Sequence, residues 1–388
     1  MATIMIVMLP EPGHLNPTYK LAKALKRRGH RVCYLSAPDY ETEIHERGLE
    51  FIPFFTEAPQ EEPLAADLVN GSEDFSCDSG LSVRRFTENQ ACDVLAQTQR
   101  FNELVVEYRP DLFLVDMYTP AIALMAHRAG VQSVFLNTSL NAFDDYGGAS
   151  AFEPVLNIPE LVLCPQELDL PRPSQGRRRF YLGPSIDLDK AGGDFPWQRI
   201  RKDKPLIYCS LGTQSRFFEA ESRILIQSVI GAMWARQDWQ AVIATGARMN
   251  PNSFSEVHVN TVLVSRAPQL EILKRASLMI THGGLGSVKE CIHFGVPMIV
   301  FPGVGDQPHN ATRVVHHGLG ARGDIRKVSI EVVQSLIDKV DKNPMFKSRV
   351  EAMSRKFKEI EAEDKGTRII EKILAALAAR DKNRLKVG

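Results

Sequence analysis

The chain has 388 residues, of which 44% are hydrophobic and 24% are charged, and its 47 basic residues balance its 47 acidic residues. This length favours two domains, and the composition is that of an ordinary soluble globular protein. The zero net charge argues against nucleic acid as a partner, because no global positive field attracts phosphates.

Cysteine spacing and hydropathy exclude further classes of protein. The six cysteines are scattered, without a CxxC pair or a zinc-type cluster, so we expect no metal and a reducing, cytoplasmic setting. No apolar run reaches the ~20 residues that a membrane helix needs. Residues 369–380 are amphipathic and precede a basic tail; we expect a helix packed on the protein rather than membrane contact. Nothing in the sequence indicates an oligomeric state.

Apolar strand-like runs alternate with segments of helical periodicity along the chain. In the first half the predicted strands are 3–9, 32–35, 111–115 and 133–137, and the predicted helices are 18–28 and 120–129. In the second half the predicted strands are 206–210, 240–244, 261–264, 278–281 and 297–301, with helices at 219–235, 269–275 and 286–294. This alternation is typical of parallel sheets covered by helices.

A stretch rich in Pro, Gly and charge separates the two series and indicates an interdomain linker. The predicted organisation is an N-terminal domain at 1–195, a linker at 196–204, a C-terminal domain at 205–368, and a terminal helix at 369–388 that can pack back on the first domain. The predicted fold class is α/β, with two Rossmann-like doubly wound domains facing across a cleft. Ligands of such sheets bind beyond the carboxyl ends of the strands, so the cleft is the expected site.

Two segments of the first half are predicted to be long loops that leave strand ends. Residues 57–80 contain seven acidic residues and no basic one, and residues 141–160 mix aromatic residues with Gly and Pro. Their composition suits surface loops or disorder, and no role is predicted for them.

The sequence THGGLGSVKE at 281–290 stands between two apolar strands. Its glycines allow a ligand to approach the backbone, and the N–H groups at the start of the following helix form a ready anion site. His282 and Ser287 can donate further hydrogen bonds, so we expect a phosphate or diphosphate there. Glu290 can accept from vicinal hydroxyls, such as those of a ribose. The alternative is a tight turn with a structural role only.

A second candidate for ligand binding is a carboxylate next to an amide. Asp306 and Gln307 follow the strand at 297–301, where a carboxylate beside an amide suits sugar hydroxyls, although loop capping is equally open.

His14 is predicted to lie in the loop before a helix that starts at Asn16-Pro17, near the cleft, where it can act as a general base. Asp116 follows the strand at 111–115 and can orient its imidazole. Their alternatives are a turn residue and a helix N-cap.

These motifs together resemble a known family. HGGLGSVKE, followed by FGVPMIVFPGVGDQPHNATRV, resembles the donor-binding signature of the UDP-glycosyltransferase family, the two-Rossmann-domain GT-B enzymes, in the style of bacterial natural-product and macrolide-type glycosyltransferases. The segments GHLNP, SLGT, APQ and YLGPSI resemble other parts of the same family, so the correspondence covers nearly the whole chain.

The resemblance implies a role for each matching residue. His14 corresponds to the catalytic base and Asp116 to its partner. The implied donor-binding residues are Thr213, Arg266, Gln269, His282, Gly284, Gly286, Ser287, Glu290, Asp306, Gln307 and Asn310. Arg266 stands where family members often carry a Trp stacked on the nucleobase, and Gly286 stands where plant members carry Asn.

The implied activity is inverting, metal-independent transfer of a hexose from a nucleotide sugar to a hydroxyl of a small lipophilic or natural-product acceptor. UDP-glucose is the expected co-substrate, and no cofactor is expected. Alternatives are a dTDP-deoxysugar-dependent antibiotic glycosyltransferase and a non-hydrolysing sugar-nucleotide epimerase. His14 and Asp116 argue against a catalytically inactive binding protein. An NAD-dependent oxidoreductase is disfavoured, because PEPGHLNP rather than G-x-G-x-x-G follows the first strand.

Overall fold

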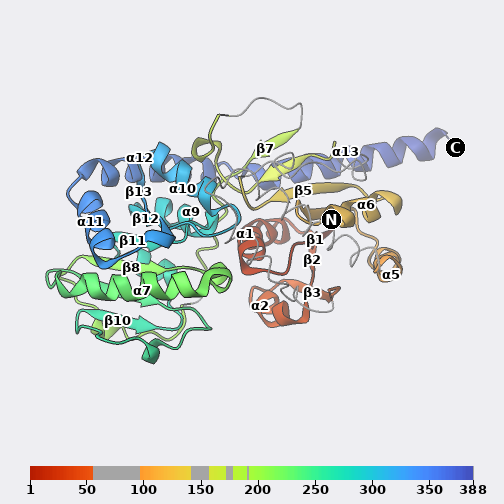
Figure 1. The fold of residues 1–388 in the computed structure, drawn as a ribbon. Helices are drawn as coiled ribbons and strands as arrows, with labels where there is room; N and C mark the ends of the chain where they lie inside the picture. Colours follow the sequence, from red (N-terminus) through yellow and green to blue (C-terminus); the bar gives the residue numbers. More distant parts are fainter. Residues whose placement is uncertain (56–96, 141–156, 172–177, 190–191, 388) are drawn as a thin grey trace. The chain divides into compact units, whose positions relative to one another are not determined.

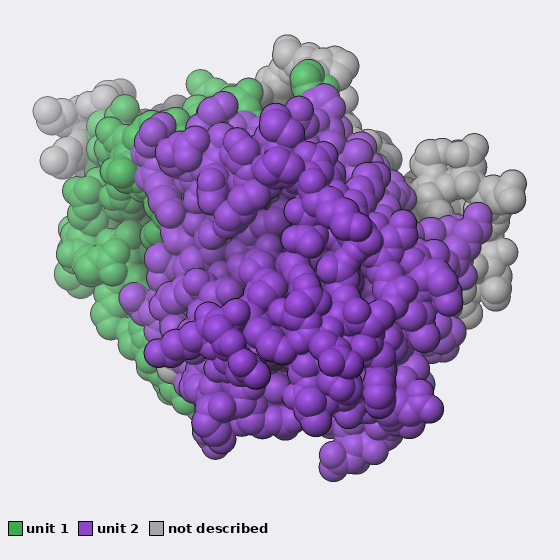
Figure 2. Space-filling view, turned by 90° about the vertical axis from the view of Figure 1, so that its left-hand side faces the viewer, with its two compact units in different colours: residues 1–166, 171–187, 360–388 green, residues 167–170, 188–359 purple. Residues whose placement is uncertain are grey.

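The computed structural model (Figure 1) describes residues 1–55, 97–140, 157–171, 178–189 and 192–387. The chain divides into two compact units (Figure 2). Unit 1 contains residues 1–166, 171–187 and 360–388, and unit 2 contains residues 167–170 and 188–359. The acidic segment 57–80 and most of the segment 141–160 lie outside the described residues.

Unit 1 is built on a seven-stranded sheet in the order β3-β2-β1-β4-β5-β6-β7, and its neighbouring strands pair in parallel. The strands are β1 (Thr3–Val7), β2 (Arg31–Ser36), β3 (Glu50–Pro53), β4 (Leu112–Asp116), β5 (Ser133–Asn137), β6 (Glu160–Val162) and β7 (Arg179–Tyr181). The helices are α1 (Pro12–Arg27), α2 (Glu41–Glu46), α5 (Thr98–Tyr108), α6 (Pro120–Arg128) and α13 (Lys365–Val387).

Both faces of the unit 1 sheet are buried, as the apolar composition of its strands requires. Successive side chains of a strand point to opposite faces. Met5 and Val7 therefore join a buried cluster with residues of α5 and α6, while Ile4 and Ile6 join a second cluster with residues of α1. Ile370 of α13 belongs to this second cluster, so the C-terminal helix covers the same face as α1.

Unit 2 is built on a six-stranded parallel sheet in the order β10-β9-β8-β11-β12-β13. The strands are β8 (Leu206–Ser210), β9 (Gln240–Ala244), β10 (Thr261–Val264), β11 (Leu278–Thr281), β12 (Met298–Val300) and β13 (Gly320–Arg322). The helices are α7 (Glu219–Trp234), α8 (Gln269–Leu273), α9 (Leu285–Phe294), α10 (Gln307–His316), α11 (Ile330–Asp341) and most of α12 (Pro344–Ala362).

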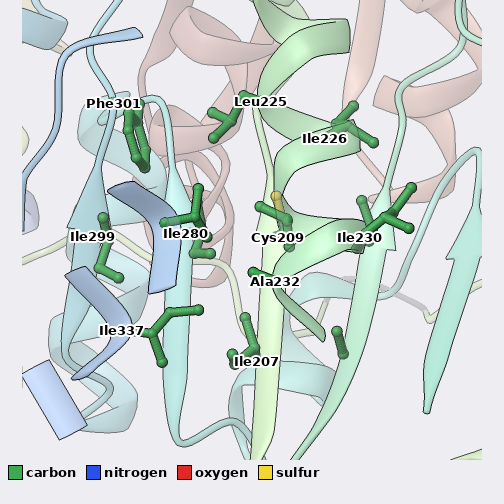
Figure 3. Close-up of a cluster of buried hydrophobic side chains, with 14 of the residues drawn as sticks. Ile207, Cys209, Leu225, Ile226, Ile230, Ala232, Ile280, Ile299, Phe301 and Ile337 are labelled. Carbon is green, nitrogen blue, oxygen red and sulfur yellow. The ribbon is translucent and has the colours of Figure 1, made fainter. Parts of the chain in front are cut away.

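One buried cluster holds the sheet of unit 2 against α7 and α11. Figure 3 shows side chains of β8, β11 and β12 meeting those of α7, and the cluster includes Ile207, Cys209, Leu225, Ile226, Ile230, Ile280 and Ile299. Because this packing fixes the strands, it also fixes the loops that leave their carboxyl ends.

The strand orders confirm the predicted α/β class and its two Rossmann-like sheets. In each sheet the direction of winding reverses once, between β1 and β4 in unit 1 and between β8 and β11 in unit 2. Such a reversal is where the ligands of doubly wound sheets bind. The cleft between the two domains stays a prediction.

The structural division differs from the predicted boundaries at 196–204 and 369. Residues 188–204 belong to unit 2, because Arg199 bonds to the carbonyl of Thr261 and the Arg201 N–H donates to Gln240. At the C-terminal end, the chain returns to unit 1 at residue 360 instead of 369. Among the described helices, none is long and apolar enough to cross a membrane.

Candidate functional site

His14 and Asp116 lie together in unit 1: Asp116 is the last residue of β4, and His14 lies in the helix that follows β1. His14 Nδ1 is 2.7 Å from Asp116 Oδ2. A carboxylate can only accept, so Nδ1 carries the proton and Nε2 keeps the lone pair. This is the tautomer in which an imidazole can remove a proton from a ligand.

The pair is held in place by its surroundings. The carboxylate of Asp116 is fully buried and accepts from the backbone N–H groups of Leu9 (3.1 Å) and Tyr118 (2.9 Å). The Tyr118 ring meets the imidazole at 88°, with centroids 5.1 Å apart, and Thr138 Oγ1 lies 3.3 Å from Nδ1. The His14 side chain remains 14% exposed, so the imidazole is supported on several sides and still open to a ligand.

Sequence reasoning had singled out neither Tyr118 nor Thr138 as a site residue. Their position was the available signal, because each follows within two residues of the end of β4 or β5. Polar and aromatic residues there face the same edge of the sheet as Asp116.

The prediction that His14 lies in a loop is wrong. Helix α1 begins at Pro12, with Glu11 as its N-cap, so His14 occupies the first turn. Pro12 suits the first helical position, where a missing N–H removes no intrahelical bond. Pro17, which was taken to mark the helix start, lies inside the helix. The imidazole is therefore carried by a helix, which fixes it better than a loop would.

Three strand ends meet in unit 2. The register pairs Thr281 of β11 with Ser210 of β8 and with Val300 of β12. The segments that follow these strands therefore leave the same edge of the sheet. They contain most of the residues predicted to bind the donor.

His282 is buried between two glycines. A Cβ added at Gly212 would lie 2.5 Å from its Cε1, and a Cβ added at Gly284 would lie 2.6 Å from its Nε2. Only glycine leaves room for the ring at these positions. Burial lowers the pKa of His282 to about 4, although a hydrogen bond with the backbone of Ser210 opposes the shift. The imidazole is therefore neutral at pH 7 before any anion binds.

The start of α9 offers the backbone groups of an anion site. Its N-cap is Gly284, which has no side chain to cap the first N–H groups of the helix. Gly286 is exposed, and a Cβ at this position would meet nothing within 4 Å. The first turn of α9 is therefore open to a ligand and carries the positive end of the helix dipole.

Gln269, Ser287 and Glu290 come together beside this helix start. Gln269 Nε2 donates to Ser287 Oγ (3.2 Å) and to Glu290 Oε2. All three are partly exposed, so a ligand can reach them. A carboxylate and a hydroxyl one turn of α9 apart, joined by an amide, can accept from and donate to a sugar.

Asp306 and Gln307 occupy the start of α10 rather than a loop, as its N-cap and its first residue. Gln307 is fully buried, and its Oε1 accepts from the N–H groups of Gly303 (2.8 Å) and Val304 (3.1 Å). Its Nε2 donates to Gln214 Oε1 (3.0 Å), a residue that sequence reasoning missed. These bonds favour the loop-capping alternative for Gln307.

Asp306 and the remaining predicted donor residues have different environments. Asp306 is partly exposed, and its Oδ2 accepts from Asn310 Nδ2 at 2.9 Å. Thr213 is exposed at the start of a 3₁₀ helix (Thr213–Phe218), and Arg266 is exposed on the loop between β10 and α8. In the part of the chain that the structure describes, no three His, Cys, Asp or Glu side chains gather as a metal site.

The comparison with protein families agrees with this geometry. Residues 204–373 match the family described as UDP-glucoronosyl and UDP-glucosyl transferase. This match confirms the resemblance and the predicted class of enzyme, a glycosyltransferase.

Similar proteins extend the likeness to the whole length. The NDP-glycosyltransferase YjiC of Bacillus licheniformis is 26% identical over 96% of this chain and 98% of its own. The oleandomycin glycosyltransferase of Streptomyces antibioticus is 26% identical over 100% of this chain and 94% of its own. The solved structure of the spinosyn rhamnosyltransferase SpnG complexed with thymidine diphosphate has a TM-score of 0.75 at 19% identity, and the match covers 96% of this chain and 100% of that one. This structure supports the two-domain fold.

Proposed function

We propose that the protein is an inverting glycosyltransferase that moves a hexose from UDP-glucose to a hydroxyl of a small lipophilic or natural-product acceptor. The observation that carries the proposal is the His14–Asp116 pair, 2.7 Å apart, in a chain whose residues 204–373 match a family of UDP-sugar transferases. A buried carboxylate that orients an imidazole is the arrangement of a general base.

In the proposed reaction, His14 Nε2 removes the proton of the acceptor hydroxyl. The acceptor oxygen attacks the anomeric carbon, a new C–O bond forms, and the bond to the diphosphate breaks. Asp116 stabilises the imidazolium that results. Attack opposite the leaving group turns an α-linked donor into a β-glycoside.

The leaving diphosphate would be stabilised by the N–H groups at the start of α9, by Ser287 and by His282. In the proposed reaction negative charge develops on this diphosphate, and hydrogen-bond donors already in place there would stabilise it. The proposed reaction needs neither a metal ion nor a cofactor, because helix dipole and hydrogen bonds offset the charge.

The choice of UDP rests on Glu290. A carboxylate bound by Gln269 can accept from two vicinal hydroxyls of a full ribose but from only one of a 2'-deoxyribose. Asp306 is proposed to accept from the hexose hydroxyls, and the proposed role of Gln307 is to hold the turn at 303–304 beside it.

A dTDP-sugar is the second candidate donor. Arg266, in place of a stacking Trp, can accept thymine as well as uracil, and the spinosyn rhamnosyltransferase binds thymidine diphosphate. An epimerase of the same architecture is the third reading, and it would act on its nucleotide sugar without an acceptor.

The test compares kcat/KM for UDP-glucose, UDP-N-acetylglucosamine and dTDP-glucose with one promiscuous phenolic acceptor. We expect UDP-glucose to be preferred and UDP release to require the acceptor. Preference for dTDP-glucose would refute the argument from Glu290. Preference for the N-acetyl donor would place the error in the hexose pocket, and sugar conversion without acceptor would refute transfer. A thermal-shift screen with UDP, dTDP, GDP and NAD provides an independent check, because a ligand that binds only the folded state raises its stability.

A further inference from the structure

A buried hydrogen-bond network joins the turn at Gly283 to side chains outside the predicted donor site. Asn310 Nδ2, on α10, donates to the carbonyl of Gly283 (3.0 Å) and to Asp306 Oδ2 (2.9 Å). Gly283 has a φ of +88° and connects β11 to the N-cap of α9. Asn310 therefore holds both the backbone of the phosphate turn and the carboxylate that faces the hexose in the proposed function.

Arg313 determines which way the amide of Asn310 points. Its NH1 donates to Asn310 Oδ1 at 3.2 Å. A guanidinium has only donors, so it can face the amide oxygen and never the amide nitrogen. A flipped amide would turn its nitrogen toward Arg313 and its oxygen toward the Gly283 carbonyl and the Asp306 carboxylate. The observed orientation is thus the only one that satisfies all of these groups.

Asp169 in turn holds Arg313. Its Oδ1 accepts from Arg313 Nε (3.1 Å) and NH2 (2.9 Å), and the two side chains are only 3% and 2% exposed. A lysine could not copy this contact, because its compact ammonium lacks the planar fork that reaches Asp169 and Asn310 at once. A buried ion pair of this kind adds little net stability compared with apolar residues, but it fixes geometry well.

The segment that carries Asp169 has a second anchor at the C-terminal end of α10. Residues 167–170 belong to unit 2, although the residues on either side of them in the sequence belong to unit 1. His317 Nε2 lies 3.1 Å from the carbonyl oxygen of Leu168, which can only accept, so His317 is the donor. The segment that carries Asp169 is therefore itself held, through Leu168, by the residue that follows α10.

We propose that Arg313 is a positioning residue for the donor. Held by Asp169, it fixes Asn310, and Asn310 fixes the Gly283 turn so that His282 and the first N–H groups of α9 face the diphosphate. The role assigned to the network rests on the proposed function, but its effect on the turn does not. The experiment therefore has one arm without ligand and one with ligand.

The first arm measures amide hydrogen exchange in the unliganded full-length protein. Arg313→Lys keeps a positive charge for Asp169 but removes the bond to Asn310, so exchange at residues 283–287 should become about tenfold faster. The matched control is Ser354→Ala, which removes a buried hydrogen bond to the His293 carbonyl (2.7 Å) at the opposite end of α9. It should leave exchange at 283–287 unchanged. Equal exchange in Arg313→Lys and the wild type would overturn the proposal.

The second arm compares the affinities for UDP and uridine by calorimetry. Arg313→Lys should weaken UDP binding about tenfold and leave uridine binding unchanged, because only the diphosphate meets the turn. In an Asn310→Ala background the same substitution should add less than about twofold, since Arg313 acts through Asn310. An undiminished effect in that background, or an equal loss for uridine, would overturn the proposal.

A second variant covers the case in which Arg313→Lys does not fold. Asp169→Asn keeps an acceptor oxygen for Arg313 and loses only the charge, so it should shift exchange and UDP binding in the same direction by a smaller factor. No change in exchange with Asp169→Asn would overturn the proposal. A wild-type protein that binds no UDP would refute the proposed donor, and the exchange arm would still decide the network.

Discussion

Substitution of Gly284 tests whether His282 belongs to an anion site. Gly284 has φ of −58° and ψ of 137°, which alanine adopts without strain, so the effect of Gly284→Ala must come from contacts. The new Cβ would lie 2.6 Å from His282 Nε2 and 3.1 Å from its Cε1, whereas ordinary contacts are 3.4–4 Å. The imidazole would have to move by about 1 Å.

The ring has little room for this movement. On its other side a Cβ built at Gly212 would lie 2.5 Å from Cε1, so the Gly212 backbone already lies close to the ring. Overpacking of this kind costs roughly 1–3 kcal/mol, and alanine is also a poorer N-cap than glycine. We therefore expect Gly284→Ala to lower the free energy of unfolding by about 2 kcal/mol. Displacement of the ring should weaken the binding of UDP but not of uridine.

The matched control for stability alone is Gly286→Ala, two residues further along the chain, in the first turn of α9. Its Cβ would meet nothing within 4 Å, and alanine is the better helix former, so this variant should gain roughly 0.5–1 kcal/mol in stability. Urea unfolding gives both stabilities, and calorimetric titration with UDP and uridine gives the affinities. If Gly284→Ala equals the wild type in stability and in UDP affinity, the reasoning about His282 is wrong.

Three further predictions concern the proposed base His14 and the proposed donor site around His282 and Glu290. His14→Ala should reduce kcat by roughly 10²–10⁴-fold with the donor affinity unchanged, and turnover at the wild-type level would contradict the assignment of the base. Burial depresses the pKa of His282 from 6.5 to about 4, so between these two pH values the folded state binds fewer protons than the unfolded state. The free energy of unfolding must therefore fall as the pH falls. Between pH 7 and pH 5 this group should lower the free energy of unfolding by about 2 kcal/mol. Urea unfolding of His282→Ala should therefore depend less on pH than that of the wild type. An unchanged pH dependence would count against a buried neutral imidazole. Glu290→Ala should abolish a preference for UDP over 2'-deoxy-UDP of ~1–3 kcal/mol measured by calorimetry, and a preference that survives the substitution would exclude Glu290 as the ribose ligand.

The sequence by itself predicted several strands correctly and indicated candidate site residues at strand ends. Strands β5, β8, β9, β10 and β11 begin and end where they were predicted, because each is a short apolar run bounded by turn residues. The parallel alternation also placed Asp116 and His282 at carboxyl strand ends without any knowledge of tertiary contacts. Residue type and spacing then indicated an anion site and a base, and the resemblance supplied the sugar chemistry.

The start of the first helix was predicted wrongly, because two prolines compete for the first helical position. Both Pro12 and Pro17 can open a helix, and the sequence offered no means to choose between them. Packing accompanies the earlier start, because Leu15, which precedes Pro17, is fully buried and lies one helical turn before the fully buried Tyr19.

Only the tertiary structure decided what the buried polar groups bind. The sequence left Gln307 open to sugar binding or loop capping, and its amide meets Gln214, 93 positions earlier in the chain. Nothing in the sequence pairs Arg313 with Asp169, which lies 144 positions away. A side chain's chemistry can be read from the sequence, but the partners that satisfy it depend on which distant segments the fold brings within hydrogen-bonding distance.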